Sequence, residues 1–107
     1  MSDDVLVQLA ATISARRAAP PDSSYTRQLL DAGPVECAKK LGEEAIETVI
    51  AGTGESDEQL KAEAADLIYH LLVLLESRGV AIADVLAVLD KRSGVSGLKE
   101  KAERGER

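Results

Sequence analysis

The chain has 107 residues, a length that suits one domain with a modest core, and we expect a single domain over residues 1–107. Its 19 acidic residues outnumber its 13 basic residues, which gives a net charge of −6 at pH 7. This negative charge argues against a nucleic acid or an anionic membrane as a partner, because both are bound through clustered Lys and Arg.

The spacing of apolar residues predicts helices throughout the chain, and no alternating strand pattern is present. Ser2 is suited to cap a first helix over residues 3–17, in which apolar residues recur at helical spacing. Ser23 or Ser24 can cap a short second helix over residues 25–31.

A third helix is predicted over residues 34–51, with Pro34 at its first position and Gly52 and Gly54 ending it. Gly42 lies in the middle of this helix, where glycine costs about 1 kcal/mol relative to alanine, and this suggests close approach by a neighbouring helix or a ligand. One face of the helix is apolar and is expected to lie in the core: Val35, Ala38, Leu41, Ala45, Ile46, Val49 and Ile50.

Ser56 followed by Gln59 has the spacing of a capping box and predicts the start of a fourth helix, which continues to Arg78 before Gly79. The second half of this helix, from Leu67 to Leu75, is apolar around nearly its whole circumference. A small monomer has too few helices to cover such a surface, so we infer a homodimer.

A last helix is expected over residues 82–92, followed by a flexible loop and, from about residue 98, a charged tail. The fold class is therefore all-α, a dimeric bundle of four to five helices. The single Cys37 and the lack of a signal segment predict a reduced, cytoplasmic protein. The longest strongly apolar run, residues 71–75, is too short to span a bilayer.

Two acidic pairs carry the chemistry. Residues three apart on a helix share one face, so Glu44 and Glu47 form one pair and Glu63 and Asp66 form another. A hairpin folded about Glu55 brings Glu47 level with Glu63, and Glu44 level with Asp66. Four converging carboxylates require a compensating cation, and hard oxygen ligands suit Mg²⁺ or Mn²⁺. The alternative is ordinary solvated surface charge, since Glu is common on exposed helix faces.

The segments KLGEEAIETVIA (40–51) and EAADLIYHLLVLL (63–75) closely resemble the phosphoribosyl-ATP pyrophosphohydrolase family, whose members are all-helical MazG-like nucleotide pyrophosphohydrolases. Further matches are Ser24-Tyr25-Thr26 and the segment RSGVSGL (92–98), so that the resemblance covers about residues 24–101. The resemblance implies hydrolysis of phosphoribosyl-ATP to phosphoribosyl-AMP and pyrophosphate, the second step of histidine biosynthesis. It also implies that Mg²⁺ is ligated by four carboxylates: Glu44, Glu47, Glu63 and Asp66.

Bound Mg²⁺ would neutralise the triphosphate, and a carboxylate among Glu43, Glu44 and Glu47 would deprotonate the attacking water. Lys40 either contacts phosphate or pairs with the acids one turn away. A phosphoribose clamp is expected near the C-terminus, with a plain disordered tail as the alternative, and its candidates are Arg92, Ser96 and Gly97.

His70 and Tyr69 are expected to be hydrogen-bonded residues at a helix interface rather than catalytic groups, and Cys37 a small apolar filler. Two other functions stay open. The first is a house-cleaning pyrophosphohydrolase acting on free dNTPs, which would share the acidic motifs without needing a phosphoribosyl clamp. The second is a non-catalytic helical dimerisation module whose acidic residues are merely solvated.

Overall fold

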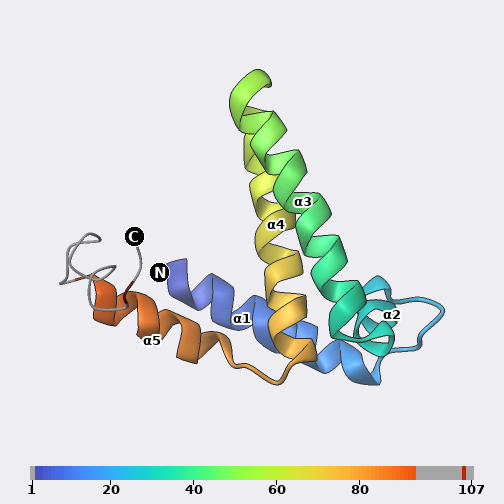
Figure 1. Cartoon of the computed structure of the whole chain (residues 1–107). Coiled ribbons are helices and arrows are strands. Elements are labelled where there is room, and N and C mark those ends of the chain that lie inside the picture. The colour runs from blue at the N-terminus through green and yellow to red at the C-terminus, as the bar shows by residue number, and fades with distance from the viewer. Residues whose placement is uncertain (1, 94–104, 106–107) are drawn as a thin grey trace.

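The computed structural model describes residues 2–93 and Gly105, and every regular element in that part of the chain is helical (Figure 1). The predicted all-α fold is confirmed. None of the helices within the described residues is both long enough and apolar enough to cross a membrane. The elements in chain order are α1 (Ser2–Ala15), the 3-10 helix η1 (Arg16–Ala18), α2 (Tyr25–Ala32), α3 (Pro34–Gly54), α4 (Asp57–Ser77) and α5 (Ile82–Arg92).

The helix boundaries follow from local chemistry. The Ser24 hydroxyl accepts a hydrogen bond from the Arg27 backbone N–H and caps α2. Gly33 adopts a φ of 96°, and Pro34 then occupies the first turn of α3, where a missing N–H costs nothing. At the start of α4, the side chain of Ser56 and that of Gln59 each bond the other residue's backbone N–H, so the predicted capping box is confirmed.

The predicted end of α3 is wrong by three residues, because the helix continues through Gly52 to Gly54. Within this last turn, the Thr53 hydroxyl donates to the Val49 carbonyl at 3.0 Å. The chain leaves the helix only at Glu55, whose backbone is extended and whose N–H still bonds the Ala51 carbonyl. Glycine lowers helix propensity without preventing helical geometry, so tertiary contacts with α4 decide the boundary.

The long helices α3 and α4 form an antiparallel hairpin that projects as an arm from a base made by α1, α2 and α5 (Figure 1). The buried core lies in the base, where α1, α2, the start of α3 and the end of α4 meet. The base extends from α5 at one end to α2 at the other, and the arm rises between them (Figure 1). The core side chains are Ile13, Leu29, Leu30, Cys37, Leu72 and Val73.

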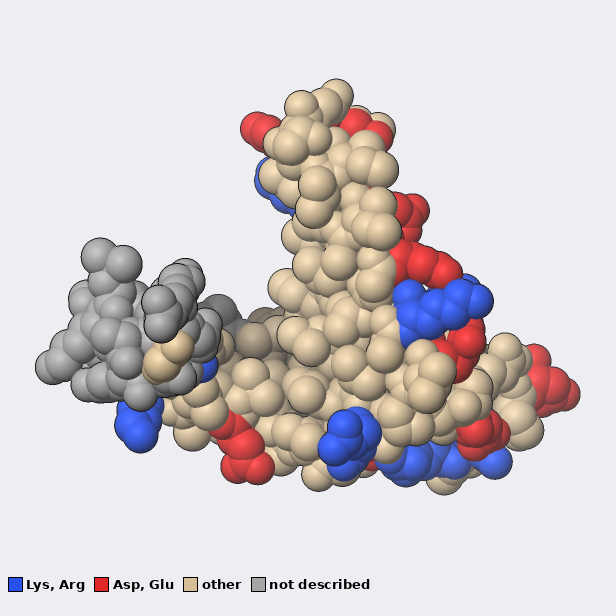
Figure 2. Space-filling model, viewed as in Figure 1, with Lys and Arg blue, Asp and Glu red and all other residues tan. Residues whose placement is uncertain are grey.

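The expected core stripe of α3 is wrong for most of its members, although Leu41 and Ala45 are half-buried. Val35 is 86% exposed, and Ile46 and Val49 are each 64% exposed, whereas Cys37 and Ala51 are the buried residues of this helix. The reason is that α3 packs mainly on α4, and among the described residues its other main neighbour is α2, in the base. Figure 2 shows the result, a broad face of the arm with almost no charged atoms beside an edge that carries acidic residues with basic ones among them.

The expected close approach at Gly42 does not occur within this chain, because a Cβ built there would meet nothing within 4 Å. Gly42 lies on the same exposed face of α3 as Ile46 and Val49, four and seven residues further on. A neighbouring helix from the same chain is therefore excluded as the reason for this glycine among the described residues.

Shortening a core side chain should destabilise the fold. Leu72 is 3% exposed and belongs to the core cluster, so Leu72→Ala should lower the free energy of unfolding by about 2–5 kcal/mol. The exposed Val35 provides the matched control, and Val35→Ala should change that free energy by less than about 0.5 kcal/mol. Chemical denaturation of both variants measures the difference, and equal stabilities would contradict this assignment of the core.

Candidate metal and substrate site

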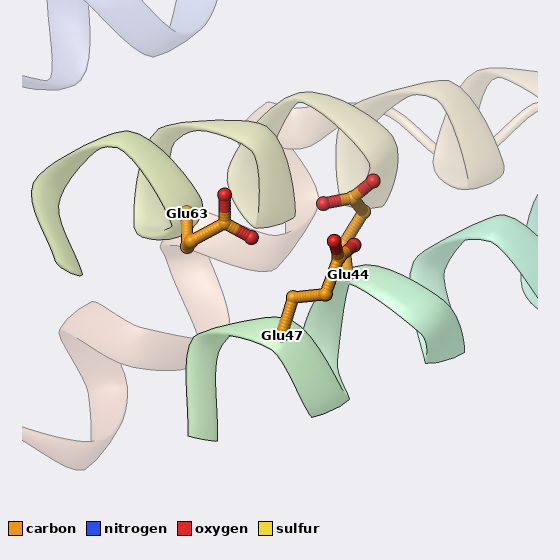
Figure 3. Close-up of side chains that lie close together, drawn as sticks. All are labelled: Glu44, Glu47 and Glu63. Atoms are coloured by element: carbon orange, nitrogen blue, oxygen red, sulfur yellow. The ribbon is translucent and has the colours of Figure 1, made fainter. Parts of the chain in front are cut away.

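Three carboxylates converge between the two helices of the arm. Glu44 and Glu47 come from α3 and Glu63 comes from α4, and their side chains turn toward the space between the helices (Figure 3). One oxygen from each carboxylate lies within 4.8 Å of the other two. We call these three residues the carboxylate triad. Three hard oxygen donors at this separation match the ligand chemistry of Mg²⁺ and Mn²⁺.

The register of the hairpin is fixed next to the triad. The Thr48 hydroxyl lies 2.8 Å from the Glu44 carbonyl and 3.2 Å from the Glu63 carbonyl, so one side chain touches the backbones of both helices. This contact holds Glu47 level with Glu63, which is the pairing predicted from a hairpin folded about Glu55. Thr48 was not singled out from the sequence, because a threonine on a helix usually bonds only to its own preceding turn.

The electrostatics of the triad favour a bound cation. Burial raises the pKa of the Glu44 carboxyl, and the charges of Glu47 and Asp66 add to that rise. Burial likewise raises the pKa of Glu63, with the same two neighbours adding to it. The Glu63 Oε2 atom is also buried, and none of the described residues gives it a hydrogen bond. A buried carboxylate oxygen without a donor is costly in a metal-free protein and well placed for a cation, so the residues present fit Mg²⁺.

Asp66 lies one turn after Glu63 and is exposed, outside the 4.8 Å group formed by the triad. Its charge nevertheless raises the pKa values of both Glu44 and Glu63, which places it close to the cluster. The ligand role expected for Asp66 therefore stays a prediction.

Glu43 and Lys40 lie on α3 beside the triad. The Lys40 ammonium is 3.6 Å from a Glu43 carboxylate oxygen, so Lys40 pairs with an acid one turn away, as one of the two expectations had it. Both side chains remain partly accessible. A surface pair of this kind contributes little to stability, so a phosphate group could displace the Glu43 carboxylate from the ammonium at small cost.

A hydrogen-bonded network joins α2 to α4 below the triad. The Tyr25 hydroxyl is 3.1 Å from His70 Nε2, and His70 Nδ1 is 2.8 Å from the Asp66 carbonyl. The Thr26 hydroxyl bonds the Tyr69 hydroxyl in the same interface. The interface roles predicted for His70 and Tyr69 are confirmed. Their partners were missed, although Ser24-Tyr25-Thr26 and Tyr69-His70 both place polar groups that need partners among apolar residues.

The expected phosphoribose clamp is described only at its first residue. Arg92 ends α5 and is exposed at its surface. Ser96 and Gly97 lie outside the described residues, as does the tail expected from about residue 98. The clamp therefore stays a prediction.

Comparison with known proteins identifies the family. Residues 6–93 match the family model described as phosphoribosyl-ATP pyrophosphohydrolase. A protein of Erythrobacter litoralis named phosphoribosyl-ATP pyrophosphatase is 58% identical over 96% of this chain and 99% of its own length. Proteins of the same name from Dinoroseobacter shibae and Cereibacter sphaeroides are each 54% identical over 94% of this chain and 98% of their own length. The chain therefore belongs to the phosphoribosyl-ATP pyrophosphohydrolase family.

Proposed function

We propose that this chain hydrolyses phosphoribosyl-ATP to phosphoribosyl-AMP and pyrophosphate, the second step of histidine biosynthesis. The observation that carries the proposal is near-full-length identity of 54–58% to proteins named for this activity. The carboxylate triad supports it, because cleavage of a polyphosphate needs a cation to offset the charge on the phosphates. We place the reaction in the cytoplasm, as expected from the lone cysteine.

The proposed metal ligands are the triad residues Glu44, Glu47 and Glu63, together with Asp66. When bound, Mg²⁺ or Mn²⁺ would neutralise phosphate charge and lower the pKa of a coordinated water. The chain's own contribution is to hold these carboxylates on two helices whose register is fixed by Thr48, so that little rearrangement accompanies binding.

A carboxylate among Glu43, Glu44 and Glu47 is proposed to take the proton from the water that attacks the α-phosphorus. Glu43 is the strongest of these three candidates, because it lies outside the triad. Its oxygen lone pairs would therefore not be used to ligate the proposed metal and could accept a proton. Its neighbour Lys40 is proposed to bind a phosphate oxygen, together with the clamp residues Arg92, Ser96 and Gly97.

Substrate choice separates this function from its rivals. Pyrophosphate release should be measured with Mg²⁺ from phosphoribosyl-ATP and from each of the four dNTPs. We expect kcat/KM for phosphoribosyl-ATP to exceed that for every dNTP by about 100-fold or more, since binding groups on the extra phosphoribose are lost with the smaller substrates. Comparable rates would indicate the house-cleaning activity, and no release from any substrate would indicate the non-catalytic module.

Glu63→Gln should show that the Glu63 carboxylate destabilises the metal-free fold and is needed for Mg²⁺ binding. Because the pKa of Glu63 is raised, its protonated form favours folding, and that contribution is lost as the pH rises through the raised pKa. At pH 7 in EDTA, Glu63→Gln should therefore raise the unfolding temperature. This gain should vanish as the pH falls below the ordinary carboxyl value of 4.5. Saturating Mg²⁺ should raise the unfolding temperature of the wild type but not of the variant.

Two control variants sharpen this measurement. Glu58 is an exposed acid on the same helix, paired with Lys61 at 3.0 Å, so Glu58→Gln should leave both the metal-free stability and the Mg²⁺ effect nearly unchanged. Glu43→Gln should keep the Mg²⁺-induced rise while lowering kcat by about 100-fold or more, as expected for loss of a general base. A full Mg²⁺ effect in Glu63→Gln would refute the proposed metal site.

A homodimer is proposed to cover the apolar face of the arm. The exposed side chains on this face belong to both helices, and a helix from a second chain could approach closely at Gly42. Contiguous exposed apolar surface of this kind marks interaction sites in proteins. The exposed residues are Ile46 and Val49 of α3 and Ile68 and Leu71 of α4.

Sedimentation equilibrium tests the homodimer. The wild type should sediment with twice the chain mass of 11.3 kDa, and Val49→Glu should sediment as a monomer because a charge would be buried in the interface. Val88 is similarly exposed but lies on α5, so Val88→Glu should leave the mass unchanged. A monomeric wild type would refute this proposal while leaving the metal site untouched.

A further inference from the structure

The hydrogen bonds of His70 fix the direction of the bond that it makes with Tyr25. His70 is buried between α2 and α4, and its Nδ1 lies 2.8 Å from the Asp66 backbone carbonyl. A carbonyl oxygen can only accept, so Nδ1 carries the proton. In the neutral ring Nε2 is then an acceptor, and the hydrogen bond of 3.1 Å to the Tyr25 hydroxyl must be donated by tyrosine.

The consequence for Tyr25 is that the single O–H of its hydroxyl is already used in the hydrogen bond to His70. The phenolic oxygen keeps its lone pairs and can only accept any further hydrogen bond. The residue is 50% exposed, so part of it is accessible to a ligand. Partial burial raises the pKa of the Tyr25 hydroxyl, with Lys40 opposing the rise, so the group stays protonated near neutral pH.

Tyr25 lies beside the proposed site. The charges of Lys40, Glu44 and Glu43 act on its hydroxyl, which places the hydroxyl near these side chains. His70 also bonds the backbone carbonyl of Asp66, a proposed metal ligand, so the Tyr25–His70 pair adjoins the acidic cluster. An acceptor at this place cannot bind a phosphate oxygen, which is itself an acceptor, but it suits an uncharged donor on the same ligand.

We propose that the Tyr25 hydroxyl oxygen accepts a hydrogen bond from a sugar hydroxyl of the substrate, and that His70 is the positioning residue that orients it. The inference rests on the proposed function for the identity of the substrate. Both α2–α4 contacts of the network then have distinct tasks. The Thr26–Tyr69 bond holds the helices together, and the Tyr25–His70 bond presents an acceptor to the ligand.

Tyr25→Phe tests this proposal, because it removes the hydroxyl and retains the ring that meets His70 edge to face. We expect KM for phosphoribosyl-ATP to rise about three- to tenfold, the loss that one hydrogen bond accounts for, with kcat changed less than twofold. Thr26→Val is the matched control on the adjacent residue. It removes the other α2–α4 hydrogen bond, so it should lower the unfolding temperature and leave KM unchanged.

Two variants of His70 test the positioning role. Glutamine places an amide oxygen near the position of Nε2 and can still accept from Tyr25, whereas leucine cannot. His70→Gln should therefore keep KM within about twofold of the wild type, and His70→Leu should raise it as much as Tyr25→Phe does. Combining His70→Leu with Tyr25→Phe should give no further rise in KM, because both changes remove the same contact.

Competitive inhibitors identify which group of the substrate donates the hydrogen bond to the Tyr25 hydroxyl oxygen. If a ribose hydroxyl is the donor, the wild type should bind ATP more tightly than 2′-deoxy-ATP or 3′-deoxy-ATP, and Tyr25→Phe should lose that preference. Equal loss of affinity for all three nucleotides would instead assign the donor to adenine and overturn the sugar contact. An unchanged KM in Tyr25→Phe would refute the whole inference, whereas a wild type without pyrophosphate release would refute the proposed function.

Discussion

The structure holds three mutually repelling carboxylates together, and it does so through apolar packing in the base of the molecule. Glu44, Glu47 and Glu63 bring carboxylate oxygens within 4.8 Å of one another between two helices. Two unit charges about 4 Å apart repel by roughly 4 kcal/mol at an effective dielectric near 20, so the triad alone would push the helices apart. The hairpin stays closed because its lower end is built into the core through Cys37 on α3 and Val73 on α4.

Helix α2 fixes the orientation of α4 relative to the rest of the fold. Its cap at Ser24 sets where the helix starts, and the next two residues bond to consecutive residues of α4, Tyr69 and His70. His70 also bonds the Asp66 carbonyl one turn above it, at the level of the acidic residues. The rotation of α4 about its own axis is thus tied to α2, and with it the direction in which Glu63 points. Without the bonds to α2, the register of α3 against α4 would rest on the hydrogen bond from the Thr48 hydroxyl to the Glu63 carbonyl.

Several of these features could be predicted from the sequence because they depend on short-range spacing. Glu44 and Glu47 share a face by helical periodicity, and the capping box at Ser56 marks where the chain reverses direction. Those two facts determine that Glu47 meets Glu63. The end of α3 was predicted less well, since Gly52 and Gly54 weaken a helix without ending it when packing favours its continuation.

The features that could not be predicted from the sequence are those that depend on contacts between residues far apart in the chain or on a second chain. Periodicity showed that Ile46 and Val49 share an apolar face but could not say whether the same chain covers it, and the structure leaves it exposed. In the same way, Tyr25 and His70 are 45 residues apart, and nothing in either segment names the other as its partner. Polar groups flanked by apolar residues indicate that a partner exists, and only the packing of α2 on α4 identifies it.

The open acidic site and the exposed apolar face of the arm both follow from the thinness of the hairpin. A hairpin only two helices thick cannot enclose a site, so one face remains open for a highly charged ligand and a cation, and the other is not covered by any of the described residues. Adding a third helix from the same chain to the apolar face would stabilise the arm, but placed on the acidic side it would close the site. Covering only the apolar face, as the proposed homodimer does, stiffens the hairpin and leaves the triad accessible. The exposed apolar stripe and the open carboxylate cluster are therefore complementary parts of one architecture.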